Sequence, residues 1–324
     1  MKNTSILIVM YHYVRNLSNS RYPGIKGLSV NHFYQQIEYF KSKFNFISAE
    51  QLIHAINGTR TLPLNPLLLT FDDGYIDHYT NVFPILHREN IPAFFSMPGK
   101  ILAEHKLLDV NKIHFILAST SLYKLLNMIY ERLDYYRGTE YNIPSNEELY
   151  KKLAVASRFD CAEVIFIKRL LQVELEEKLR NRIVDDLFSN CIPLKEKSFA
   201  EELYMNFEHV ALMKREGMCF GIHGYDHYWM NRLTPEELAK DIQLALATLS
   251  GIVNSKEWIC CYPYGSYSDD VIAYIKQQGA VAGFTTVVDL ADLNRYDRYM
   301  LPRFDTNDFP PISQQYLEFY NSGL

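Results

Sequence analysis

The sequence has few cysteines, and none of them shows the spacing of a metal or redox motif. Its five cysteines contain no CxxC pair and form an odd set, so neither a zinc ribbon nor a complete disulfide framework is indicated. Cys260 and Cys261 are neighbours, and the side chains of neighbours in a strand point to opposite faces. We therefore expect reduced thiols in the protein core.

The sequence also lacks an excess of basic residues and a long apolar run. A formal net charge of -5 offers no electrostatic attraction for nucleic acid. The apolar run Ile6–Met10 is too short for a signal-peptide core, and a spanning helix needs roughly 20 such residues. We therefore expect no nucleic-acid partner, no transmembrane segment and a cytoplasmic location, although a chain trimmed of its leader would look the same.

What the sequence does contain is a globular composition in which strand and helix patterns alternate. Its 48% hydrophobic and 22% charged residues are typical of a compact protein and exclude a largely disordered chain. Capping boxes at Ser48 and Thr234 predict the start of two helices. Apolar runs typical of strands occupy residues 6–10, 67–71, 93–96, 218–222, 258–262 and 282–286. The alternation predicts an α/β fold with a parallel sheet.

Residues 102–205 interrupt this alternation with long helical patterns, among them Val164–Leu187. We interpret this block as a helical insertion between the two parts of one barrel, residues 1–101 and 206–324, because about 220 residues suffice for an α/β barrel. The insertion could cover a cleft, bind a lipid-linked or nucleotide carrier, or form a homodimer contact. Simple packing explains its helices as well.

Two adjacent carboxylates, Asp72 and Asp73, follow the apolar run that ends at Phe71 and precede Gly74. Neighbouring charges at the end of a buried strand are costly unless a cation compensates them. A metal ion would do so if the glycine turns the backbone and lets both carboxylates face one cleft. A helix N-cap followed by a first-turn acid explains the same pair. The pair alone does not decide between a metal site and a helix cap.

Two histidines, His223 and His227, follow the predicted strand 218–222. Imidazoles four residues apart can bind one ion, and two imidazoles with one carboxylate form a common three-ligand zinc site. The chain has ten histidines, so a chance pair at this spacing is also a reasonable explanation. Combined with the aspartate pair at another strand end, the histidines favour a metal site.

A third string, Tyr262–Gly265, follows the predicted strand 258–262. The proline and the glycine on either side of Tyr264 indicate a tight turn, which could direct a backbone N–H toward a developing oxyanion. An ordinary turn explains this string equally well when it is taken by itself.

In this order the three strings resemble those of the NodB-homology polysaccharide deacetylases, a carbohydrate esterase family that removes N-acetyl or O-acetyl groups from sugars. The resemblance covers about residues 6–100 and 206–308, and the string TFDDG at 70–74 matches the first motif of the family completely. It implies a distorted (β/α) barrel of about seven parallel strands. Residues 10–12 and 301–305 are similar to the branch that contains bacterial poly-N-acetylglucosamine deacetylases.

The resemblance also implies roles for individual residues. Asp73, His223 and His227 would bind a divalent metal ion, zinc before cobalt, nickel or manganese. Asp72 would be the general base, and in the poly-N-acetylglucosamine branch the general acid comes from the first strand, which indicates His12. A histidine simply buried beside a strand end is the alternative for that residue. The backbone N–H of Tyr264 would share the oxyanion with the ion.

Two positions depart from the family pattern. Gly224 stands where the family usually has a serine or threonine after the first histidine, so a hydrogen bond that steadies this loop would be missing. Cys261 stands where the third motif usually begins with an arginine. The partner of the catalytic aspartate must then come from elsewhere, and Arg303 is our candidate.

The implied function is metal-dependent hydrolysis of an N-acetyl or O-acetyl group on a sugar, in the biosynthesis of surface polysaccharide or lipopolysaccharide. The substrate would be an acetylated amino sugar, free or linked to a lipid or nucleotide. Two alternatives stay open: a catalytically degenerate sugar-binding protein on the same fold, and the same hydrolysis on a formyl group or a non-sugar amide. Asp72 favours an enzyme, because a pure binder has no use for a carboxylate that coordinates nothing.

Overall fold

The computed structural model describes residues 4–322, with the backbone alone described for 320–322. The chain forms two compact units. The first contains the start of the chain to Asn16, Gly27–Lys106 and the chain from Ala200 onward, and the second contains Leu17–Lys26 and Leu107–Phe199. Within residues 4–322, none of the helices is both long enough and apolar enough to cross a membrane.

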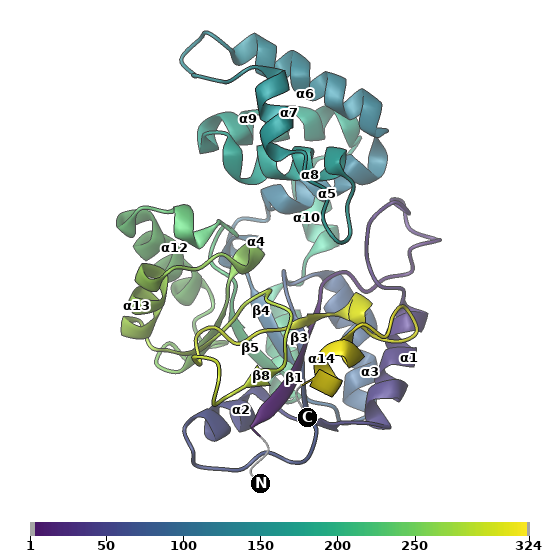
Figure 1. The fold of residues 1–324 in the computed structure, drawn as a ribbon, viewed down its shortest axis with the longest axis vertical. Helices are drawn as coiled ribbons and strands as arrows, with labels where there is room; N and C mark the ends of the chain where they lie inside the picture. The colour runs from purple at the N-terminus through teal and green to yellow at the C-terminus, as the bar shows by residue number, and fades with distance from the viewer. Residues whose placement is uncertain (1–3, 323–324) are drawn as a thin grey trace. The chain divides into compact units, whose positions relative to one another are not determined.

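The first unit is built on a curved, mostly parallel sheet (Figure 1). Its strand order is β7-β6-β5-β4-β3-β1-β8, and every pair is parallel except β1 with β8. Two further short strands pair in parallel at the side of this path, β2 with β3 and β9 with β1. The strands are β1 (Ser5–Tyr11), β2 (Asn45–Phe46), β3 (Pro66–Phe71), β4 (Phe94–Met97), β5 (Cys219–Ile222), β6 (Trp258–Cys261), β7 (Ala280–Phe284), β8 (Ala291–Asp292) and β9 (Phe304–Asp305).

A short segment near the C-terminus joins the two sides of the parallel strands. Leu301 forms a parallel bridge with Phe284 of β7, and three residues later Phe304 pairs with Val9 of β1. Because one stretch of chain is bonded to both β7 and β1, the sheet curls into a distorted barrel. The predicted fold class is therefore confirmed, with the antiparallel β8 and the two-residue strand β9 in place of full parallel strands.

Aromatic rings connect the central strands just below their carboxyl ends. Tyr11 of β1 stacks on Phe71 of β3 at 4.9 Å, Phe71 stacks on Phe95 of β4 at 4.9 Å, and Phe95 stacks on Phe220 of β5 at 5.5 Å. These residues are direct partners in the strand register. Since Tyr11 and Phe71 are fully buried, the ring stack fixes the residues that follow them, His12 and Asp72, at one edge of the sheet.

Helices lie on both sides of the sheet, with α12 and α13 on one side and α1 and α3 on the other (Figure 1). The predicted capping boxes at Ser48 and Thr234 are confirmed by reciprocal side-chain and backbone hydrogen bonds. The helices are α1 (Val30–Lys41), α2 (Ala49–Ile56), a π-helix (His78–Val82), α3 (Phe83–Arg88), α4 (Gly99–Ala103), α11 (Phe207–Arg215), α12 (Pro235–Thr248), α13 (Asp269–Gln277) and α14 (Tyr316–Ser322).

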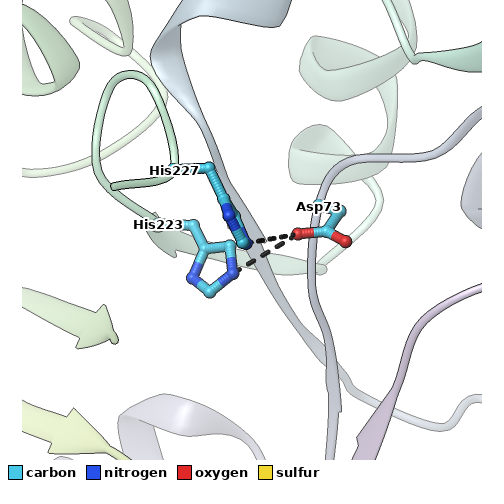
Figure 2. Close-up of side chains that lie close together, drawn as sticks. All are labelled: Asp73, His223 and His227. Carbon is cyan, nitrogen blue, oxygen red and sulfur yellow. Dashed lines mark ion pairs between the residues drawn. The ribbon is translucent and has the colours of Figure 1, made fainter. Parts of the chain in front are cut away.

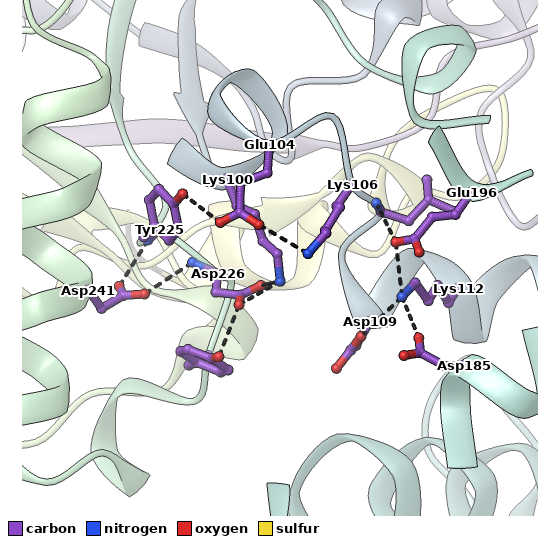
Figure 3. A network of polar contacts seen from close by, with 12 residues as sticks. Lys100, Glu104, Lys106, Asp109, Lys112, Asp185, Glu196, Tyr225, Asp226 and Asp241 are labelled. Atoms are coloured by element: carbon purple, nitrogen blue, oxygen red, sulfur yellow. Dashed lines mark hydrogen bonds and ion pairs between the residues drawn. The ribbon is translucent and has the colours of Figure 1, made fainter. Parts of the chain in front are cut away.

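The second unit is helical. Its helices are α5 (Asp109–Ser119), α6 (Leu122–Tyr136), α7 (Asn146–Leu153), α8 (Ala162–Arg169) with a π-helical turn (Leu170–Glu174), α9 (Glu177–Cys191) and the start of α10 (Glu196–Leu203). Lys112 of α5 is buried and forms ion pairs with Asp185 of α9 at 2.6 Å, Glu196 at 3.0 Å and Asp109 at 3.9 Å (Figure 3). The pair with Asp185 holds α5 against α9.

The helical pattern over Val164–Leu187 is confirmed, but the structure interrupts it at Leu175 and Glu176. The chain is extended at Leu175 and Glu176, with ψ of 150° and 137°, so two helices form instead of one. Burial explains the break, because Leu175 is only 7% exposed and the turn lets α8 and α9 each bury an apolar face. Neither glycine nor proline marks the turn, so the local sequence does not reveal it.

Candidate metal centre

The three sequence strings that contain the candidate site residues, 70–74, 223–227 and 262–265, lie at the carboxyl ends of parallel strands of one sheet. His12 follows β1, Asp72 and Asp73 follow β3, His223 follows β5, and the turn that contains Tyr264 follows β6. The carboxyl ends of parallel strands meet at one edge of the sheet, which is where α/β barrels place their active sites. The fold therefore brings residues that are far apart in the sequence to one place.

Asp73, His223 and His227 form a buried cluster (Figure 2). The Nε2 atoms of His223 and His227 lie 3.4 Å and 3.3 Å from Oδ1 of Asp73, and the three ligand atoms are all within 4.8 Å of one another. The residues are 2%, 2% and 7% exposed. Of the three strings, two supply this cluster, as the side chains converge from the ends of β3 and β5.

These residues fit a divalent metal ion. Oδ1 of Asp73 is buried and has no hydrogen-bond partner among the residues that the structure describes. Ligand atoms about 3.3–3.6 Å apart are expected around a tetrahedral ion whose bonds are about 2.0–2.2 Å long, and both distances from Oδ1 agree with this. One carboxylate oxygen and two imidazole nitrogens suit zinc and other first-row metals.

Hydrogen bonds orient the cluster from behind. Nδ1 of His223 lies 2.8 Å from the carbonyl oxygen of Cys261, so this nitrogen carries the proton and Nε2 is left as the acceptor. The hydroxyl of Tyr75 donates to Oδ2 of Asp73 at 2.5 Å, and the Tyr75 ring stacks on Tyr13 at 4.0 Å. Sequence reasoning missed Tyr75, because nothing in the local pattern separates it from a core tyrosine.

The charges in the cluster influence one another. Burial would raise the pKa of Asp73, but the neighbouring imidazoles of His227 and His223 hold it well below the usual range. Burial lowers the pKa of His227. Burial would also lower the pKa of His223, but Asp73 and Asp72, together with the hydrogen bond to the Cys261 carbonyl, raise it. Metal binding requires neutral imidazole nitrogens, so the metal affinity of this site should depend on pH.

Three residues at this edge have left-handed backbone conformations that side chains other than glycine seldom adopt. The φ angles are 74° at Asp73, 57° at His227 and 57° at Tyr264. Such conformations cost about 1–3 kcal/mol each and cluster at functional sites. Gly74 also has a positive φ, 67°, which agrees with the turn expected after the aspartate pair. The backbone is therefore strained where the chemical strings meet.

Asp72 is held by a guanidinium. Arg303 contacts both of its oxygens, Nη1 to Oδ1 at 3.0 Å and Nη2 to Oδ2 at 2.8 Å. Ser96 of β4 donates to Oδ1 at 2.6 Å, a contact that the sequence did not indicate. Burial would raise the pKa of Asp72, but Arg303, with a smaller effect from His223, holds it well below the usual range. Asp72 is therefore ionised beside the cluster.

Arg303 occupies the segment that joins β7 and β1, and it is 1% exposed. Its Nε donates to the carbonyl oxygen of Thr285 at 2.9 Å, and its Nη1 lies 3.2 Å from the hydroxyl of Thr70 and 3.7 Å from Sγ of Cys261. The guanidinium thus passes directly beside the cysteine. The structure offers Asp72 an arginine partner even though residue 261 is not one.

Replacing Arg303 by methionine is expected to lower the free energy of unfolding by about 3–5 kcal/mol, because the buried Asp72 carboxylate loses its counter-charge. Urea unfolding measures the loss. The double variant Arg303→Met/Asp72→Asn should recover most of it, since the uncompensated charge is then gone. As a control, Arg298→Met removes an arginine that bonds to Ile56 and Asn57 and should cost about 1 kcal/mol. An equally small loss at Arg303 would contradict the role of the ion pair.

His12 and Tyr264 lie beside the cluster and are partly exposed. The carbonyl oxygen of His12 lies 2.9 Å from Nε2 of the buried His78, and a positive charge on His12 would lower the pKa of both aspartates. The Tyr264 ring meets His227 edge-on at 4.6 Å and stacks on Trp229 at 4.8 Å. The sequence did not single out His78 or Trp229.

Comparison of sequences shows two similarities to known proteins. The sequence model of the polysaccharide deacetylase family matches residues 199–283, a stretch that contains His223, His227 and Tyr264. A segment of 53 residues is 43% identical to the poly-beta-1,6-N-acetyl-D-glucosamine N-deacetylases of Escherichia coli K12 and O157:H7. That match covers 16% of this chain and 8% of the length of those relatives.

Solved structures share the fold over nearly the whole chain. The Streptococcus pyogenes deacetylase PplD in complex with acetate has a TM-score of 0.56 at 16% identity and covers 97% of both chains. IcaB from Ammonifex degensii has a TM-score of 0.56 at 18% identity, with 98% of this chain and 96% of that chain covered. A de-N-acetylase from Aggregatibacter actinomycetemcomitans has a TM-score of 0.55 at 16% identity, with 96% and 99% covered. At these identities the likeness shows the fold.

Proposed function

The chain resembles the polysaccharide deacetylase family, in the branch of the poly-N-acetylglucosamine deacetylases, and we propose that it is a metal-dependent hydrolase that removes an N-acetyl group from an amino sugar. The observation that carries the proposal is the arrangement of two neighbouring carboxylates. Asp73 faces two imidazoles, whereas Asp72 is ionised and bonded to Arg303 and Ser96 instead. A binding site alone needs only the first of these two aspartates.

In this proposal Asp73, His223 and His227 hold the divalent ion, which would polarise the acetyl carbonyl and lower the pKa of a bound water. The chain prepares these ligands in advance. Tyr75 holds one carboxylate oxygen of Asp73 and leaves the other for the ion. The carbonyl of Cys261 fixes the tautomer of His223. Burial of all three side chains strengthens their electrostatic interactions.

Asp72 would act as the general base that takes the proton of the attacking water. Arg303 and Ser96 fix the direction of its carboxylate. The same arginine keeps Asp72 ionised at neutral pH and makes it a weaker proton acceptor, because a base is most effective when its pKa lies near the working pH. The arrangement therefore favours orientation of the base over its basicity.

Tyr264 and His12 would act on the two ends of the breaking amide. The left-handed turn at Tyr264 would direct its backbone N–H toward the oxyanion. Stabilisation of the oxyanion is usually a large contribution to the rate of acyl transfer. His12 would protonate the leaving amine. The products would be acetate and a free amino sugar.

Replacing His12 by alanine is expected to lower kcat on an N-acetyl amide by about 10²–10⁴-fold and to lower kcat on an activated acetyl ester much less. An amine must be protonated to leave, whereas an activated alcohol leaves without an acid. Acetate release from both substrate types measures the two rates. Equal losses on amide and ester would contradict the acid role, and exposed His32, at the start of α1, provides the control His32→Ala.

The substrate we propose is a saccharide that contains N-acetylglucosamine, because the curated relatives are named for deacetylation of its β-1,6 polymer. We also propose that the substrate is a lipid- or nucleotide-linked precursor, that the chain takes part in surface polysaccharide or lipopolysaccharide biosynthesis, and that it acts in the cytoplasm. The proposed ion is zinc, and the helical insertion would form a homodimer contact.

The decisive experiment combines elemental analysis with an acetate assay on the purified chain. We expect one equivalent of a divalent metal, acetate release from N-acetylated glucosamine oligomers, and loss of this activity on chelation with recovery when the metal is returned. Metal binding without acetate release from any acetylated amino sugar would favour the sugar-binding alternative. A chain that releases acetate equally well after complete removal of metal would contradict the proposed chemistry.

A further inference from the structure

The loop that carries both histidines is held by α4 on one of its sides. The backbone N–H groups of Gly99 and Lys100 donate to the carbonyl oxygens of Gly224 and Tyr225 at 3.1 Å and 2.9 Å. Nζ of Lys100 lies 2.6 Å and 2.7 Å from the two carboxylate oxygens of Asp226. These contacts fix the carbonyl groups and the acidic side chain of the loop.

Two backbone N–H groups of the loop face α12, where they meet a single carboxylate. Asp241 accepts the backbone N–H of Tyr225 on Oδ2 at 2.9 Å and that of Asp226 on Oδ1 at 3.0 Å (Figure 3). Its side chain is 5% exposed, so both oxygens are directed at the loop and little reaches water. Hydrogen bonds from backbone N–H groups to a buried carboxylate are stronger than neutral ones.

Asp241 also explains the glycine in the loop. A Cβ atom at position 224 would lie 2.8 Å from Oδ2 of Asp241, and the backbone there has a φ of 69°. Both the space and the conformation therefore exclude a side chain. A serine or threonine at this position could not form its usual hydrogen bond, and the aspartate takes over the task of steadying the loop.

We propose that Asp241 is a positioning residue that sets the spacing of His223 and His227 by clamping the loop between them. The inference rests on the metal site of the proposed function. Asp241 touches neither imidazole in any contact described here, and it acts through the backbone of Tyr225 and Asp226. Without the clamp the two Nε2 atoms are no longer held at 3.3–3.4 Å from Asp73, and ordering the loop must be driven by metal binding.

The test compares Asp241→Asn and Asp241→Ala with the wild type in the full chain. Asparagine leaves one of the two backbone N–H groups without an acceptor, and alanine leaves both. Zinc affinity, measured by competition with a chromophoric chelator, is expected to fall about 10-fold for asparagine and up to about 100-fold for alanine. Hydrogen exchange of the peptide 223–227 should become about 10-fold faster in the metal-free protein.

Asp308→Asn is the matched control, because Asp308 is buried and accepts the backbone N–H of Asp305 far from this loop in sequence. Its amide oxygen can still accept that N–H, so the variant removes only a buried charge and should keep its zinc affinity and the exchange rate of peptide 223–227. Lys100→Met is the second variant and keeps the inference testable if Asp241→Asn does not fold. It frees only the Asp226 side chain, and we expect zinc affinity to fall about threefold.

The outcomes separate this inference from the proposed function. Zinc affinity and loop exchange of Asp241→Asn within twofold of wild type would overturn the clamp. If the wild type binds zinc but releases no acetate, the proposed reaction fails while the clamp is still tested by affinity. If the wild type binds no ion, the proposed metal site is wrong, and hydrogen exchange tests the clamp. Faster exchange of peptide 223–227 in Asp241→Asn than in the wild type would support the clamp, and unchanged exchange would contradict it.

Discussion

Asp72→Asn is expected to lower kcat for deacetylation by about 10²–10⁴-fold while the protein still binds one divalent ion. The amide has the volume of the carboxylate but cannot take the proton of the attacking water. The three atoms that face the metal site belong to Asp73, His223 and His227, and none of them is altered. Acetate release and elemental analysis on the same preparation measure the two quantities.

Asp77→Asn is the matched control for this variant. Asp77 is also a buried aspartate paired with an arginine, since it lies 2.7 Å from Nε of Arg15. The control should lose stability from a broken ion pair but keep kcat within about threefold, because Asp77 belongs to none of the strings assigned to the reaction. Normal turnover of Asp72→Asn would show that Asp72 is not the base. If Asp72→Asn also lost the metal, Asp72 would have to be part of the metal site.

His223→Ala is expected to abolish both metal binding and turnover. The substitution removes one of three ligands, and it also removes the hydrogen bond to the Cys261 carbonyl that fixes the tautomer. Asp73 and His227 alone leave too few protein ligands for a tightly held catalytic ion, so we expect metal affinity to fall by more than about 100-fold. Dialysis against buffer followed by elemental analysis should then find less than one tenth of an equivalent.

The control for this prediction is His87→Ala, which removes an exposed imidazole paired with Glu216. It should keep the full metal content and the full rate. If His223→Ala still held one equivalent of tightly bound metal, the ion would have to be bound by other ligands. That result would contradict the assignment of His223 as a metal ligand. Together the two variants separate the roles of ligand and base, because only the asparagine variant keeps the ion while the reaction stops.

Features set by neighbouring residues could be predicted from the sequence. The apolar runs before Asp72 and before His223 are strands, and the capping boxes at Ser48 and Thr234 begin helices. Hydrophobic pattern, helix caps and turn residues act over a few positions, so the elements that they determine can be predicted without the tertiary structure. The predicted barrel class followed from the order of these elements and from the family resemblance, and the comparisons support both.

Features that depend on long-range packing could not be predicted in this way. The break between α8 and α9 comes from the burial of Leu175 rather than from a breaker residue. Tyr75 and Ser96 are core-like residues in the sequence. Ser96 reaches Asp72 because β4 pairs with β3, and Tyr75 donates to Asp73 while its ring stacks on Tyr13. Asp241 stands on an ordinary amphipathic helix until its carboxylate meets the histidine loop.

The sequence by itself determined which residue types are available at the strand ends, because strands and their turns are local. The tertiary structure alone decided which of those side chains meet. Arg303 reaches Asp72 across 231 positions only because the segment 301–305 is bonded to both β7 and β1. The pairing of strands is a property of the whole barrel, since each register depends on all the surface that the sheet buries.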